Sequence, residues 1–135
     1  MNTLKVAVLT LALPLLGANT AAAAMTCGTS DALQGVTHVK PLQETFNVGK
    51  AELTRRAGAR LFIPAEAGMS VPYLQRQLNC RVQTAGGGQN DPLSVPKVKA
   101  TVSAAGEYFV VDLRASTLAD AKEVQRRSEL LLQGK

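Results

Sequence analysis

The fold of this chain is decided by residues 97–114, which read KVKATVSAAGEYFVVDLR. Val98, Ala100 and Val102 alternate with polar residues, and this period of two is typical of a half-exposed strand. A second apolar run follows the Ala-Gly pair at residues 105–106, which we expect to form a tight turn. The segment therefore predicts a β-hairpin with one apolar face.

The turn also predicts how the two strands of this hairpin pair. If residues 105–106 form the loop, Val102 faces Phe109 and Lys99 faces Asp112. Opposite charges at facing positions stabilise an antiparallel pair of strands. The apolar face and the charge pair therefore favour the same register.

Two amphipathic helices and a further strand surround the hairpin. The first helix is predicted over residues 71–82, with Ser70 as its N-cap, because its apolar side chains fall on one narrow stripe. The second helix is expected to begin at Ser116 or Thr117. A short apolar run at residues 59–64 is typical of a buried strand that precedes the first helix.

The first 24 residues are typical of a signal peptide. Lys5 provides the positive charge, residues 6–16 form an apolar core, and residues 17–24 end in four alanines. This apolar run is shorter than the roughly 20 residues that a transmembrane helix requires. We therefore expect cleavage after Ala24 and export to the periplasm or the medium, with no membrane span after cleavage.

These elements predict an α+β open-faced sandwich. The order is strand, helix, strand, strand, helix, and two helices would cover one face of a small antiparallel or mixed sheet. Phe46 and Val48 stand at strand spacing, so residues 36–58 are expected to form a strand or an irregular ribbon. The predicted segments are a signal peptide over 1–24, a partly irregular N-terminal extension over 25–57 and an α+β domain over 58–135.

Composition narrows the classes of function. The chain has 15 lysines and arginines against 10 acidic residues, and it has no tryptophan. A modest and interspersed positive charge does not indicate a nucleic-acid partner, and few aromatic residues argue against a base-stacking or carbohydrate-binding surface. His38 is the only histidine, so one chain cannot build a His-dependent triad or a polyhistidine zinc site. We expect neither an enzyme nor a cofactor.

The two cysteines leave two interpretations open. Cys80 lies off the apolar stripe of the first helix, and a disulfide to Cys27 would explain that position in an exported protein. The other interpretation is a thiol redox site or a metal site centred on Cys80. Met69 and His38 would then complete a copper-type set of soft and borderline ligands.

Part of the chain resembles a known group of proteins. The resemblance rests on GARLFI at residues 58–63, on GMSVPYLQR at residues 68–76 leading to Cys80, and on the closing hairpin and helix. Over about residues 58–131, the chain resembles small exported bacterial proteins of uncharacterised function, with the element order of a ferredoxin-like unit that lacks its final strand. In that group a histidine follows the cysteine, whereas Arg81 holds this position here.

We therefore expect a small exported, non-enzymatic binding or structural module of the bacterial cell envelope. Its partner would be a protein or another envelope component, and the sequence leaves the oligomeric state open. The exposed side of the hairpin would provide the binding surface through Lys97, Lys99, Tyr108 and Arg114. The alternative is the metal or thiol site centred on Cys80.

Overall fold

The computed structural model describes Cys27, residues 32–84 and residues 88–134. Its elements are β1 (His38–Val48), β2 (Ala51–Pro64), α1 (Val71–Thr84), the short 3₁₀ helix η1 (Pro92–Ser94), β3 (Lys99–Ala105), β4 (Tyr108–Arg114) and α2 (Leu118–Gln133). The predicted signal peptide, residues 1–24, lies outside the described residues.

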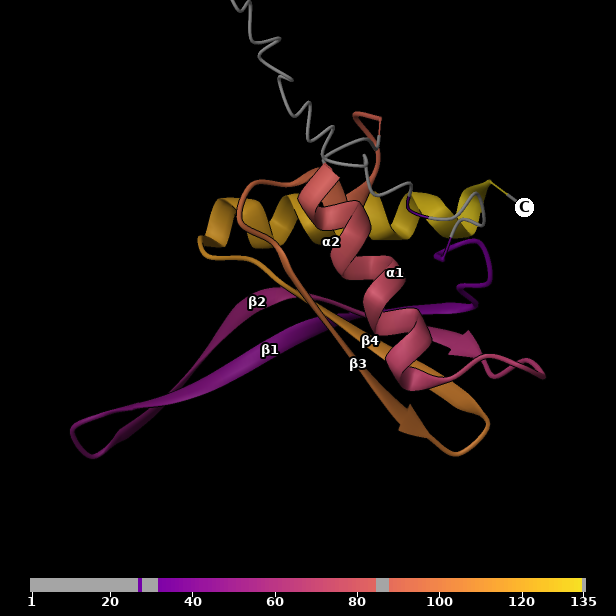
Figure 1. Ribbon diagram of the computed structural model, residues 1–135. Helices are drawn as coiled ribbons and strands as arrows, with labels where there is room; N and C mark the ends of the chain where they lie inside the picture. The colour runs from indigo at the N-terminus through magenta and orange to yellow at the C-terminus, as the bar shows by residue number, and fades with distance from the viewer. Residues whose placement is uncertain (1–26, 28–31, 85–87, 135) are drawn as a thin grey trace, which may run out of the picture.

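The strands form one antiparallel sheet in the order β1-β2-β4-β3. Both helices lie on the same side of this sheet (Figure 1). α1 connects β2 to β3 while β4 lies between them, which is the split β-α-β arrangement. The predicted α+β open-faced sandwich is therefore confirmed, and its sheet is antiparallel throughout.

The N-terminal extension is more regular than its local pattern indicates. β1 pairs with β2 from His38 opposite Phe62 to Val48 opposite Ala51. The predicted boundary between residues 57 and 58 consequently falls inside β2. Outside residues 59–64, neither strand has a strong pattern of its own, but each satisfies the backbone hydrogen bonds of the other, and this pairing determines their conformation.

The β3–β4 hairpin forms, but its register differs from the prediction by two residues. Gly106 and Glu107 form the loop, and Gly106 adopts a φ of 61°, which favours glycine. Lys99 therefore faces Arg114, and the predicted pair between Lys99 and Asp112 is wrong. Because the shift is an even number of residues, every side chain stays on its predicted face.

The core lies between the sheet and the helices. Completely or almost completely buried side chains come from every layer: Leu61 on β2, Val111 and Leu113 on β4, Leu74 and Leu78 on α1, and Val124 on α2. Burial of each such side chain stabilises the fold by about 1.5–3 kcal/mol. Leu33 and Val36, from the segment before β1, complete this cluster.

Both helices begin where the sequence predicts. The Ser70 hydroxyl accepts a hydrogen bond from the Tyr73 N–H at 3.4 Å, and the Thr117 hydroxyl accepts one from the Asp120 N–H at 3.1 Å. α1 continues to Thr84, slightly beyond the predicted end. Within the described ranges, no helix has both the length and the apolar character needed to cross a bilayer.

Candidate functional site

The face of the sheet opposite the helices is the candidate site, and we call it the open face. No described element covers it (Figure 1). One row across the sheet consists of His38, Phe62, Val110 and Ser103, each paired with the next. Since side chains alternate along a strand and the neighbours Leu61 and Val111 belong to the core, this row points away from the helices.

Three rings on the open face form an aromatic cluster, which consists of His38, Phe62 and Tyr108. Each pair of rings meets edge to face with centroids 6.4 Å apart, which is a favourable geometry for aromatic pairs. The Lys40 ammonium lies 5.4 Å from the centroid of the Phe62 ring. The neighbouring Val110 is only 7% exposed, although it lies outside the core cluster. The open face therefore has an apolar centre of its own.

A bidentate ion pair lies beside the aromatic cluster. Arg60 donates two hydrogen bonds to the Asp112 carboxylate, at 2.6 Å from Nε and 2.8 Å from Nη2. The hydrogen bond to Asp112 is the main reason that the pKa of Arg60 is raised. Asp112 thus pairs across β2 and β4, and not within the hairpin as the sequence predicted.

Glu44 joins three strands at the other end of the open face. Its carboxylate accepts hydrogen bonds from Arg55 on β2 at 3.0 Å and from Arg114 on β4 at 2.6 Å. These arginines lower the pKa of Glu44, and the hydrogen bond from Arg55 is the largest cause. Glu44 therefore carries a negative charge that two guanidinium groups already neutralise.

Positive charge exceeds negative charge on the open face. The cations are Lys40, Arg55, Arg60, Lys99 and Arg114, and the anions that pair with them are Glu44 and Asp112. Within the described part of the chain, Lys40 and Lys99 have no ion-pair partner. Lys40 borders the aromatic cluster and Lys99 lies toward the other end of the open face, so this face carries uncompensated positive charge, which favours an acidic partner.

The four residues that the sequence predicts as a binding surface do not all lie together in the structure. Lys99 and Arg114 are neighbours at one end of the open face, and Tyr108 belongs to the aromatic cluster at the other end. Lys97 precedes β3 and adopts a φ of 57°, so it is not part of the strand. The predicted surface is therefore only one side of a larger one.

Sequence reasoning missed the β1 and β2 side of this surface. The missed residues are His38, Lys40, Arg60 and Phe62. A signal for two of them was present, because Arg60 and Phe62 alternate with the apolar residues of the predicted strand at 59–64. The His38 and Lys40 positions depend on the pairing of β1 with β2, which the local pattern does not encode.

Cys27 and Cys80 form a disulfide in the structure, with their Cα atoms 5.6 Å apart. Neither of the chain's two cysteines is a free thiol in this state. His38 belongs to the aromatic cluster, whereas Cys80 lies on α1 on the other side of the sheet, and Met69 packs against the core. The three residues of the copper-type set are therefore not brought together, and no metal-ligand cluster of His, Cys, Asp or Glu occurs among the described residues.

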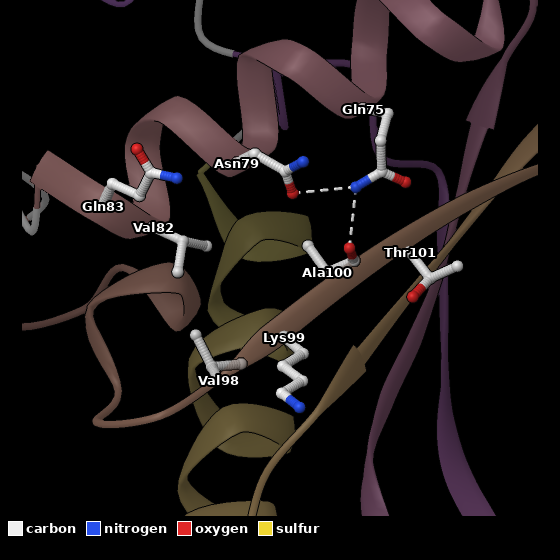
Figure 2. Close-up of a pocket in the computed structure, with 8 residues that line it drawn as sticks. All are labelled: Gln75, Asn79, Val82, Gln83, Val98, Lys99, Ala100 and Thr101. Carbon is white, nitrogen blue, oxygen red and sulfur yellow. Dashed lines mark hydrogen bonds between the residues drawn. The ribbon is translucent and has the colours of Figure 1, made fainter.

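A groove of about 400 Å³ runs between α1 and the β3 edge of the sheet (Figure 2). Within it, Gln75 Nε2 donates to the Ala100 carbonyl at 2.8 Å, and Gln75 Oε1 accepts from the Val102 N–H at 2.7 Å. Asn79 holds this amide through a further hydrogen bond of 2.9 Å. The Gln75 side chain thus takes the place of a neighbouring strand and protects this edge.

The opposite edge of the sheet is protected in a different way. Pro41 on β1 has no N–H to offer to an added strand, and a bulge interrupts the pairing between Leu42 and Gln43. Strand addition is therefore disfavoured at both edges. The open face is the better candidate for contact with a partner.

Comparisons of the chain with protein-family models, with curated proteins and with solved structures found no match. The candidate function consequently rests on the geometry and charge of the open face.

Proposed function

We propose that this chain is a small exported, non-enzymatic binding module of the cell envelope, which holds an acidic segment of a partner protein on its open face. The observation that carries the proposal is the aromatic cluster. Neither helix covers this cluster, and cations lie beside it. The His38 ring is exposed, and the Phe62 and Tyr108 rings are half-buried. Aromatic rings beside arginine are typical of the energetically important contacts in protein interfaces.

The arrangement of the cations supports an acidic partner. Asp112 holds the Arg60 guanidinium in a bidentate pair, so this side chain loses little conformational freedom when a partner binds. Lys40 and Lys99 lie on either side of this pair and remain available to carboxylates of the partner. Tyr108 adds a rigid contact surface at a low cost in side-chain entropy.

The surroundings of His38 support a binding role over catalysis. Its ring shares a hydrogen bond of 3.0 Å between Nδ1 and the hydroxyl of its neighbour Thr37. The His38 side chain is exposed. A general base in an enzyme is normally oriented by a third group beside a nucleophile, in a site that excludes water.

Photo-crosslinking in exporting cells tests the proposal. A benzophenone amino acid at position 108 is expected to give a discrete protein adduct, whereas the same group at position 129, on the exposed side of α2, is not. Reversing the charges with Lys40→Glu and Lys99→Glu is expected to remove the adduct. The charge-matched control, Arg76→Glu with Lys122→Glu on the helices, is expected to keep it.

Three outcomes would contradict the proposal. They are the lack of an adduct from position 108, adducts of equal strength from positions 108 and 129, and an adduct from position 108 that survives reversal of the open-face charges. Recovery of the chain from the cytosol with its first 24 residues uncleaved would contradict the exported location.

A further inference from the structure

The ends of β1 and β2 form a two-stranded ribbon, residues 43–56, that projects away from the rest of the molecule (Figure 1). We call this ribbon the arm. Phe46 pairs with Leu53, and Val48 pairs with Ala51, so one face of the arm is apolar. The opposite face carries polar residues, namely Thr45, Asn47, Glu52 and Thr54. The arm is therefore an amphipathic ribbon.

The apolar face of the arm is exposed. Phe46 is 38% exposed, Leu53 is 46% exposed and Val48 is 55% exposed. None of the three side chains belongs to the core cluster or packs against it. Apolar side chains that gather on one exposed face, and that fold stability does not require, are typical of an interaction site.

Cations lie at both ends of this apolar face. Lys50 occupies the turn at the tip, and the Arg55 guanidinium lies 5.4 Å from the centroid of the Phe46 ring. The carboxylate at the base, Glu44, is paired with Arg55 and Arg114. The base of the arm continues into the cationic open face, because Glu44 pairs with both Arg55 on the arm and Arg114 on β4.

We propose that the arm docks on an anionic phospholipid surface. Phe46, Val48 and Leu53 would enter the headgroup region, while Lys50 and Arg55 lie over the lipid phosphates. Apolar side chains bordered by cations are the composition with which amphipathic segments bind this interface. The inference goes beyond the proposed function, because it concerns the arm and not the aromatic cluster.

Two physical limits define this docking mode. The outer edges of a two-stranded ribbon carry backbone groups that need water or a partner, so the arm enters the interface and not the hydrocarbon core. A second copy of the chain is a poorer occupant of the apolar face, because two chains that each carry a net positive charge would repel one another. An anionic lipid surface is instead complementary in charge.

The lack of tryptophan in the chain allows a specific spectroscopic test. Phe46→Trp places a single fluorophore on the arm, and Tyr73→Trp is a matched control on α1, where the tyrosine is 40% exposed. With vesicles of phosphatidylcholine and phosphatidylglycerol, emission from Phe46→Trp is expected to shift to shorter wavelength and to be quenched by brominated lipid. Emission from Tyr73→Trp is expected to remain unchanged.

Sedimentation of the otherwise unmodified chain with the same vesicles provides the second measurement. The Val48→Ser, Leu53→Ser variant is expected to bind about tenfold more weakly, since two apolar contacts are lost. Added salt is expected to weaken binding of the unmodified chain, because it screens the cations. Circular dichroism checks that the variants keep the fold.

Several results would overturn the inference. They are an unshifted Phe46→Trp emission, an equal response from Tyr73→Trp, and equal binding to vesicles of phosphatidylcholine alone. A crosslink from position 46 to a protein, without any response to vesicles, would assign the arm to a protein partner and would also overturn it. The crosslinking from position 108 is a separate readout, so failure of either proposal is distinguishable from failure of the other.

Discussion

Gly58 is a position at which the sheet has no room for a side chain. Its φ is 152°, and a Cβ atom built there would overlap the carbonyl oxygen of Leu113 on the neighbouring strand. The residue also lies at the bulge where the arm departs from the sheet. A glycine is therefore required both for its backbone conformation and for the close approach of β4.

Gly58→Ala is accordingly expected to lower the free energy of unfolding by about 3 kcal/mol. Urea unfolding followed by circular dichroism measures this loss. Gly49→Ala is the control, because Gly49 has a φ of 64° but a Cβ atom at this position would meet no other atom within 4 Å. We expect a loss of about 1 kcal/mol from this control. Equal losses in both variants would show that the overlap with Leu113 is not the cause.

Gln75 protects the β3 edge with a single side-chain amide. Gln75→Ala is expected to lower the free energy of unfolding by about 1–3 kcal/mol, because the Ala100 carbonyl and the Val102 N–H lose their partner. The exposed edge is also expected to promote self-association. Thermal unfolding and light scattering measure the two effects.

Gln83→Ala serves as the control for this prediction. Gln83 lines the same groove, but no hydrogen bond of its side chain is found among the described residues (Figure 2). We expect this variant to keep the stability and the association state of the unmodified chain. A Gln75→Ala variant that behaved like the control would show that the amide does not protect the edge.

At the scale of elements, a network of ion pairs and hydrogen bonds connects both helices to the segment around η1. Glu123 accepts hydrogen bonds of 2.6 Å from both Arg126 and Arg127. Arg127 also donates to the Asp91 carbonyl at 3.2 Å, and the Asp91 carboxylate accepts from Arg81 on α1 at 2.7 Å. These contacts bring α1, α2 and the segment around η1 into one polar network beside the core.

The pH dependence of this network follows from Glu123. Hydrogen bonds from Arg126 and then Arg127 lower the pKa of Glu123 from 4.5 to about 2. Because the pKa is lower in the folded state, the stabilisation is complete at pH values above 4.5 and is lost as the pH falls toward about 2. Carboxyl titration by NMR is expected to give a midpoint near 2 for Glu123.

Glu123→Gln provides a second measurement of the same effect. The difference in Tm between the unmodified chain and this variant is expected to be largest above pH 4.5 and to vanish below about pH 2. Glu129→Gln is the control, since Glu129 accepts a hydrogen bond from an uncharged partner, Gln125. A Glu123 midpoint at 4.5 or above would contradict the prediction.

At the scale of the whole molecule, the disulfide joins the N-terminal segment to α1. The Cys27–Cys80 bond has a sequence separation of 53 residues, and the chain between the two cysteines includes β1 and β2. Replacing both cysteines by serine is expected to lower the free energy of unfolding by about 4 kcal/mol, because the unfolded chain regains the freedom of a long loop.

Denaturant unfolding and thiol titration check this prediction together. The native protein, isolated without reductant, is expected to show no free thiol before or after denaturation, and the serine variant is expected to unfold at lower denaturant concentration. Two free thiols in the native protein isolated without reductant would contradict the disulfide. They would also restore the alternative of a thiol or metal site at Cys80.

The sequence by itself determined the elements whose stabilising contacts are local. The hairpin over residues 97–114, both helices and the Thr117 cap follow from alternation, helical periodicity and capping chemistry within a few residues. The α+β class follows from their order. The hairpin register was predicted wrongly by two residues, because the loop forms where Gly106 can adopt a positive φ, and both registers place the same side chains on the core face.

Only the tertiary structure decided what the open face contains. His38, Phe62 and Tyr108 come from three strands, and Arg60 meets Asp112 across a separation of 52 residues. Such contacts depend on which strands pair and on which face both helices cover. Many weak long-range interactions set these choices jointly, and no short stretch of sequence encodes them. For the same reason, the sequence left two interpretations of Cys80, and the fold selected one by bringing it to Cys27.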